Sequence, residues 1–145
     1  MGSKRSADGG RPRVVLADDH REMQMRVTAL LASEFNVVAA FGDGETLVDA
    51  EAHLRPDVLV IDITMPGISG LEAAALIRRR GSQVPIVFLS VHEEAEFVLA
   101  ARRTGALGYV SKVRLASDLI PAVRAALDGR RFVSASVDVG VDEVL

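Results

Sequence analysis

The sequence of 145 residues contains no cysteine and no tryptophan, and aromatic residues make up only 4% of it. The absence of cysteine excludes disulfide bonds and thiolate metal sites. The chain also lacks an apolar run near the roughly 20 residues that span a bilayer, and its N-terminus lacks the paired basic and apolar segments of a signal peptide. We therefore expect a cytoplasmic protein that makes no membrane contact.

The chain also has no excess of positive charge, because its formal net charge is −3 at pH 7. Nucleic-acid phosphates are bound by clustered lysine and arginine. The two arginine runs, residues 78–80 and 102–103, fall at the ends of predicted helices, where cations complement the helix dipole. We therefore expect no nucleic-acid contact by this segment itself.

What the chain does have is a regular alternation of two patterns. Short apolar runs rich in β-branched residues alternate with longer segments of helical spacing. The central runs, VLVID and PIVFLS, lack polar alternation, which is typical of strands buried on both faces of a parallel sheet. The order predicts an α/β fold, a (βα)5 doubly wound parallel five-stranded sheet with right-handed crossovers. We expect strands at residues 14–17, 37–41, 58–63, 86–89 and 108–110, and helices around residues 23–31, 47–54, 70–80, 97–104 and 120–128.

The two ends of the chain lack this alternation. Residues 1–12 are polar and rich in glycine, which predicts a disordered arm or an expression remnant. Residues 13–129 carry the alternating pattern and form the predicted domain. Residues 130–145 show no clear periodicity, and we expect a tail or the start of a linker.

Polar residues follow four of the five predicted strands: Asp18 and Asp19, Asp62, Ser90, and Lys112. In open parallel sheets, ligands bind beyond the carboxyl ends of the strands. Each residue has an ordinary explanation by itself, as a turn former, a helix cap or a surface lysine. Because several such coincidences would be needed at one edge of the sheet, a common site is the better interpretation.

The residue types at this edge suggest one chemistry. Crowded carboxylates repel one another, and oxygen ligands suit Mg²⁺ or Mn²⁺. Lys112 adds a compact positive charge and Ser90 a neutral hydrogen-bond donor. A metal, a cation, a donor and a carboxylate nucleophile are the parts needed for phosphoryl transfer.

Four segments, VVLADDH, VLVIDITMPGISGLE, IVFLSVH and GALGYVSK, resemble the receiver domains of bacterial two-component response regulators, in order and spacing. The resemblance covers about residues 13–129, and ADDH and LEA are most similar to the NarL/FixJ-type class. It implies a flavodoxin-like (CheY-like) fold, with residues 130–145 starting a linker to an output domain outside this chain. Such output domains usually carry a helix-turn-helix and control transcription.

The resemblance also implies roles for individual residues. Asp62 is the expected phosphoacceptor. Asp19, Asp62 and the backbone carbonyl of Thr64 would ligate Mg²⁺ or Mn²⁺, and Asp18 would act through water. Lys112 would bind the phosphoryl oxygens.

Four positions are expected to switch or tune the domain. Ser90 would move toward the phosphoryl group and let Tyr109 rotate inward. Thr64 and His92 occupy positions that modulate the lifetime of the phosphoryl group in this family.

The expected partners are a sensor histidine kinase and a second copy of the chain, bound through the first and fifth helices after phosphorylation. The domain would be no enzyme beyond its own phosphorylation and slow autodephosphorylation. A stand-alone receiver and a phosphorylation-independent interaction module stay open. A flavin binder is disfavoured because Asp18 and Asp19 would repel the phosphate, and a haloacid-dehalogenase-type phosphatase because it needs a second aspartate where Thr64 stands.

Overall fold

The β-branched runs form the strands of one parallel sheet in the computed structural model, which describes residues 10–135 and 137. The strand order is β2-β1-β3-β4-β5-β6, and every neighbouring pair is parallel. Chain order reverses at β1, which is the switch point of a doubly wound sheet. The strands are β1 Arg13–Ala17, β2 Asn36–Phe41, β3 Val58–Asp62, β4 Ile86–Ser90, β5 Gly108–Ser111 and β6 Phe132–Val133.

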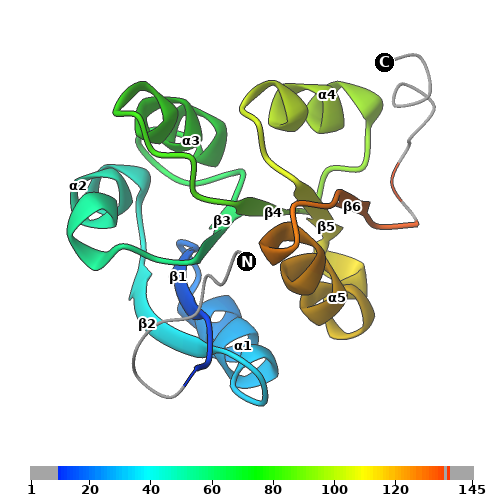
Figure 1. Ribbon diagram of the computed structural model, residues 1–145. Coiled ribbons are helices and arrows are strands. Elements are labelled where there is room, and N and C mark those ends of the chain that lie inside the picture. Colours follow the sequence, from blue (N-terminus) through cyan, green and yellow to red (C-terminus); the bar gives the residue numbers. More distant parts are fainter. Residues whose placement is uncertain (1–9, 136, 138–145) are drawn as a thin grey trace.

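Helices cover both faces of the sheet, with α1 and α5 on one face and α2, α3 and α4 on the other (Figure 1). The predicted α/β architecture of five alternating strands and helices is confirmed. Among the described residues, no helix is long and apolar enough to cross a membrane. The helices are α1 Arg21–Leu31, α2 Gly44–Leu54, α3 Gly70–Arg79, α4 Ala95–Arg103 and α5 Leu115–Leu127, and a 3-10 turn, η1, spans Lys112–Arg114.

The sheet separates two apolar clusters, and its central strands contribute to both. Every residue of β3 and β4 is buried, as their unbroken apolar runs predict. Along β3, Leu59 and Ile61 pack with α2 and α3, whereas Val58 and Val60 pack with α1 and α5. This alternation from face to face holds the carboxyl end of β3, and with it Asp62, in one orientation.

The start of α3 is fixed tightly against the end of β3. Ser69 and Glu72 form a reciprocal capping box, with hydrogen bonds of 2.8 and 3.1 Å. The amide of Gly70 donates to the carbonyl of Ile63 at 2.7 Å. A Cβ atom on Gly70 would lie 2.2 Å from the carbonyl oxygen of Asp62, so only glycine fits there.

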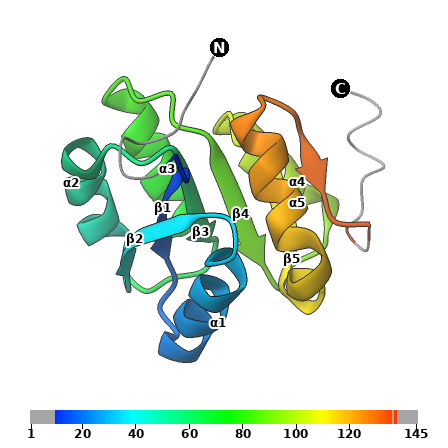
Figure 2. The same cartoon turned by 60° about the horizontal axis from the view of Figure 1, so that its bottom comes forward.

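The predicted end of the folded part at Gly129 needs correction. Phe132 and Val133 form a sixth strand that pairs with β5, at the edge of the sheet opposite β2 (Figure 2). Ser134 and Val137 are buried as well. The reason is tertiary, because β5 would otherwise leave an unpaired edge that a short apolar run can satisfy. The expected tail is therefore folded at least to Ser134, and residues 138–145 lie outside the described part.

The N-terminal boundary also shifts slightly. Pro12 is buried, and its carbonyl accepts a hydrogen bond of 2.9 Å from the amide of Asn36. Arg11 donates to the carbonyl of Ala32 at 2.8 Å. The predicted arm thus makes contacts at its last residues, and residues 1–9 lie outside the described part.

Candidate functional site

The adjacent strands β1 and β3 bring two carboxylates together at the carboxyl edge of the sheet. Asp62 ends β3 and is 3% exposed, and Asp18 follows β1 and is fully buried. The amide of Asp18 donates to the carbonyl of Phe41 at 2.9 Å, which continues the pairing with β2 by one residue. Asp19, the next residue, is exposed. The three predicted carboxylates therefore do share one site.

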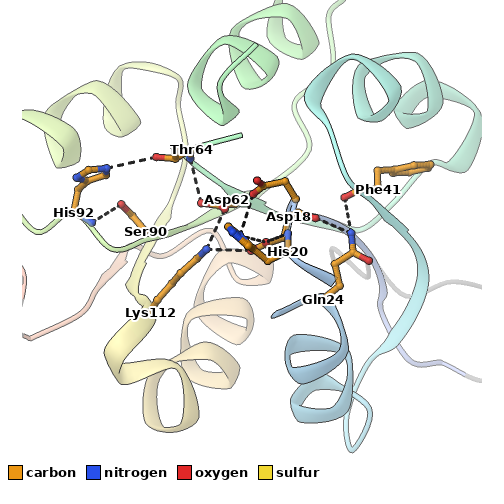
Figure 3. A network of polar contacts seen from close by, with 10 residues as sticks. Asp18, His20, Gln24, Phe41, Asp62, Thr64, Ser90, His92 and Lys112 are labelled. Atoms are coloured by element: carbon orange, nitrogen blue, oxygen red, sulfur yellow. Dashed lines mark hydrogen bonds and ion pairs between the residues drawn. The ribbon is translucent and has the colours of Figure 1, made fainter. Parts of the chain in front are cut away.

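Lys112 bridges the two buried carboxylates (Figure 3). Its Nζ atom lies 3.0 Å from Oδ2 of Asp62 and 3.2 Å from Oδ2 of Asp18. The lysine is the first residue after β5, and only 11% of its side chain is exposed. One ammonium group thus serves two carboxylates, so the site keeps an excess of negative charge.

This imbalance appears in the pKa directions. Burial raises the pKa of Asp62, and the nearby charge of Asp18 adds to the increase, whereas Lys112 only partly opposes it. Burial by itself would lower the pKa of Lys112, but its hydrogen bonds and charge pairing with Asp62 and Asp18 raise that pKa overall. The raised pKa of Lys112 favours its cationic form, and a further positive charge near Asp62 would stabilise the ionised carboxylate.

The loop after β4 joins the site from the other side. The Ser90 hydroxyl accepts a hydrogen bond of 2.8 Å from the amide of His92. The hydroxyl of Tyr109 donates to the carbonyl of His92 at 2.7 Å, and the tyrosine is only 2% exposed. Burial raises the pKa of Tyr109. Ser90 and Tyr109 are thus joined through the backbone of one loop residue, and the tyrosine ring points inward.

The two predicted tuning residues lie against each other. Oγ1 of Thr64 lies 3.5 Å from Nε2 of His92, and the imidazole ring stacks on Phe97 with 4.1 Å between ring centroids. The amide of Thr64 donates to Oδ1 of Asp62 at 3.1 Å. All eight predicted site residues therefore gather at the same edge of the sheet.

Two residues at this edge were not predicted. His20 donates its amide to Oδ1 of Asp18 at 2.8 Å, and its Nδ1 atom lies 3.2 Å from Oδ1 of Asp19. The side chain of Gln24 donates to the carbonyls of Asp18 and Phe41, at 2.6 and 3.1 Å. The position of His20 directly after the aspartate pair, and of Gln24 one helical turn later, was the available signal.

The ligand atoms present suit one divalent cation. Single ligand atoms of Asp18, Asp19, His20 and Asp62 all lie within 4.8 Å of one another. Opposite ligands of a Mg²⁺ ion at 2.0–2.1 Å lie about 4.2 Å apart, so small side-chain adjustments would suffice. The acidic cluster could therefore hold a metal, and its oxygen atoms suit a hard cation.

Comparison with known proteins gives the class. Residues 14–124 match the family of the response regulator receiver domain, and the chain belongs to this family. The receiver is of the NarL/FixJ type, as the relatives below indicate, and the expected resemblance is confirmed.

The individual relatives are response regulators. The chain is 36% identical over 126 residues to the transcriptional regulatory protein DegU of Brevibacillus brevis, covering 86% of this chain and 53% of that protein. A LuxR-family two-component response regulator from Aurantimonas sp. SI85-9A1 superposes with a TM-score of 0.86 at 31% identity, over 92% of this chain and 97% of that one. The isolated REC domain of RcsB from Salmonella enterica serovar Typhimurium, solved with the phosphomimetic BeF3−, gives 0.81 at 27% identity, over 88% and 96%. The chain thus spans about half the length of DegU.

Proposed function

We propose that this receiver domain takes a phosphoryl group from a sensor histidine kinase onto Asp62 and thereby switches its conformation and its association. The observation that carries the proposal is the position of Lys112, whose ammonium bridges Asp62 and the buried Asp18. An ammonium held 3.0 Å from the nucleophile is placed to bind phosphoryl oxygens as they arrive.

Each group at the edge has a part in the transfer. An oxygen of Asp62 forms a bond to phosphorus while the P–N bond of the donor phosphohistidine breaks, and the departing imidazole keeps the electron pair and takes up a proton from solvent. Asp19, Asp62 and the Thr64 carbonyl would hold Mg²⁺ or Mn²⁺, with Asp18 acting through water. The ion supplies positive charge against the phosphoryl oxygens when bound.

The switch would use the loop after β4. The Ser90 hydroxyl leaves the His92 amide and donates to the phosphoryl group instead. Because the carbonyl of His92 also accepts the hydrogen bond from the hydroxyl of Tyr109, a movement of this loop would shift the Tyr109 ring on β5. The inward position of Tyr109 is the one that accompanies phosphorylation.

The first prediction tests the phosphoacceptor. Wild-type protein with acetyl phosphate and Mg²⁺ should gain the mass of one phosphoryl group, and Asp62→Asn should gain none, because an amide is not a nucleophile. Intact mass spectrometry measures both. Asp49→Asn, a change at a side chain that is 80% exposed on α2, is the matched control and should behave as wild type. Equal phosphorylation of Asp62→Asn would remove the proposal.

The output is proposed from the relatives. DegU is a transcriptional regulatory protein, and one RcsB structure is described as two dimers bound to two parallel DNAs. We infer that this receiver, in the cytoplasm, controls transcription through an output domain outside this chain, and that phosphorylation promotes a homodimer through α1 and α5.

The second prediction tests this dimer. Met25 is 62% exposed, so it offers apolar surface on the solvent side of α1. Beryllofluoride should increase the sedimentation coefficient of the wild type, and Met25→Glu should prevent the increase. Leu76→Glu, which also places an acid at an exposed apolar position but on α3, is the control and should still dimerise. A dimer that survives Met25→Glu would exclude this surface.

A further inference from the structure

The segment after Gly129 is bound along the strand that carries Tyr109. The amide of Phe132 donates to the carbonyl of Leu107 at 2.9 Å, and the amide of Ser134 donates to the carbonyl of Tyr109 at 3.0 Å. These bonds extend the sheet by one strand beyond the five that the repeating strand–helix pattern supplies. The segment is therefore hydrogen-bonded to the backbone of Tyr109 itself, and a shift of β5 would change its position.

A buried serine anchors the segment to the rest of the domain. Ser134 is fully buried, and its hydroxyl accepts a hydrogen bond of 3.0 Å from the amide of Ser111, the last residue of β5. The same hydroxyl is hydrogen-bonded to the carboxylate of Asp118 on α5. Asp118 is itself 7% exposed, so the serine satisfies a buried acid that water reaches poorly.

The apolar side of the segment closes over the ring of Tyr109. Val137 is 3% exposed and lies in the same apolar cluster as Tyr109 and Val98, and Val133 packs against that cluster. The cavity left between Tyr109, Val98 and Val133 is only about 10 Å³, which is room for at most one water molecule. No phenol ring fits there while the segment is docked.

The direction in which Tyr109 could turn follows from its register with Val133, because the two residues are partners in a parallel pair and lie on the same face of the sheet. Inward, its hydroxyl reaches His92, in the loop that follows β4, on one side of β5. On the other side of β5 lies β6. A ring that rotates out of its buried position moves toward the space that Val133 and Val137 occupy, so the outward ring and the docked segment exclude each other.

We propose that the edge of β5, with the adjoining faces of α4 and α5, is a docking surface whose occupant is a later segment of this same chain, residues 132–135 with Val137. Docking of the segment and the inward position of Tyr109 favour each other. The link to phosphorylation rests on the proposed function: because phosphorylated Asp62 selects the inward ring, phosphorylation tightens the segment, and by reciprocity a docked segment strengthens binding of the phosphoryl mimic.

The chain carries its own probe for the docked state, because Tyr109 is its single tyrosine and it has no tryptophan. Ser134→Ala and, independently, Val133→Asp should make the fluorescence of Tyr109 markedly easier to quench with acrylamide. Ser117→Ala is the matched control, since Ser117 donates to the same carboxylate of Asp118 at 2.8 Å but lies on α5. The control should leave the quenching unchanged. A thermal melt of each variant shows that it is folded.

The coupling is tested by hydrogen exchange and by beryllofluoride titration. In the wild type, beryllofluoride should slow exchange of the Phe132 and Ser134 amides by at least about fivefold, and Ser134→Ala should weaken beryllofluoride binding by a similar factor. Unchanged quenching in both segment variants would overturn the docking surface. Bound beryllofluoride with unaltered exchange would overturn the coupling. Failure of the wild type to bind beryllofluoride at all would instead count against the proposed function, and the quenching comparison would still decide the docking.

Discussion

Two buried aspartates of the domain have opposite surroundings. Asp62, at the end of β3, is 3% exposed, and burial raises its pKa, whereas Lys112, which also pairs with Asp18, only partly opposes the increase. Asp118, on α5, is 7% exposed. Burial by itself would also raise the pKa of Asp118, but hydrogen bonds from Ser134, Ser117 and Arg114 together lower it.

The contrast separates a structural acid from a reactive one. Three donors complete the coordination of Asp118, so its charge is stabilised by the fold and has no need of a ligand. Asp62 shares one cation with a second carboxylate, so the negative charge of the pair is only partly compensated. A bound metal ion would balance the remaining negative charge. Without the metal, this charge lowers the stability of the folded protein.

Removing the shared cation should have the largest effect on stability. Lys112→Met leaves two buried carboxylates without the lysine cation that they share, and we expect the metal-free protein to lose about 3 kcal/mol of unfolding free energy. Urea unfolding in EDTA measures the loss. Arg124→Met, which removes the exposed ion pair with Glu34, is the control and should cost far less, because solvent screens an exposed pair. Similar losses in the two variants would mean that the buried carboxylates are hydrated.

Neutralising each aspartate in turn should change stability in opposite directions. Because the folded-state pKa of Asp118 is lowered, its contribution is complete above the unfolded pKa near 3.8 and is lost as the pH falls through the folded value. Asp118→Asn should therefore cost about 1–2 kcal/mol at pH 7. The raised pKa of Asp62 has the opposite sign, since stability falls as the pH rises from about 3.8 through its folded value.

Asp62→Asn should accordingly stabilise the metal-free protein by about 1 kcal/mol, the interaction of two charges near 4 Å in a solvated site. Millimolar Mg²⁺ should stabilise the wild type by mass action and Asp62→Asn less. Urea melts from pH 3 to 8, with EDTA and with Mg²⁺, test both members of the pair. If both Asp62→Asn and Asp118→Asn are less stable than the wild type in EDTA, the proposed difference between the two aspartates is wrong.

The smallest effect on stability is expected where the site meets solvent. Thr64 is exposed, and its contact with His92 is long at 3.5 Å, so Thr64→Ala and His92→Ala should change the unfolding free energy by less than about 0.5 kcal/mol. The lifetime of the phosphoryl group should change more, because tenfold in rate needs only about 1.4 kcal/mol in the barrier. Intact-mass time courses after removal of acetyl phosphate measure it. A lifetime unaltered by both substitutions would leave them as surface residues.

The fold and the centre of the site were predictable because both follow from local pattern. Unbroken apolar runs predicted the buried strands β3 and β4. The rule that ligands bind at the carboxyl ends of strands predicted that Asp18, Asp62 and Lys112 lie in one site. The sixth strand, β6, was not predictable in this way. Phe132 and Val133 are too short a run to show a period, and they become a strand only because β5 offers a free edge. The same holds for Gln24, whose partners are backbone carbonyls that only the folded chain brings near.

The glycine that opens α3 has a mechanical consequence for the signal. Because a Cβ atom on Gly70 would lie 2.2 Å from the carbonyl oxygen of Asp62, α3 packs closely against the backbone of the proposed phosphoacceptor. The other side is built differently: Ser90 ends β4, and the loop that follows is joined to Ser90 and to Tyr109 by one hydrogen bond each from the backbone of His92. A displacement that starts at Asp62 is therefore opposed by close packing on the α3 side and by hydrogen bonds on the β4 side. We therefore expect α3 to stay in place and the loop after β4 to move, so that the displacement reaches β5.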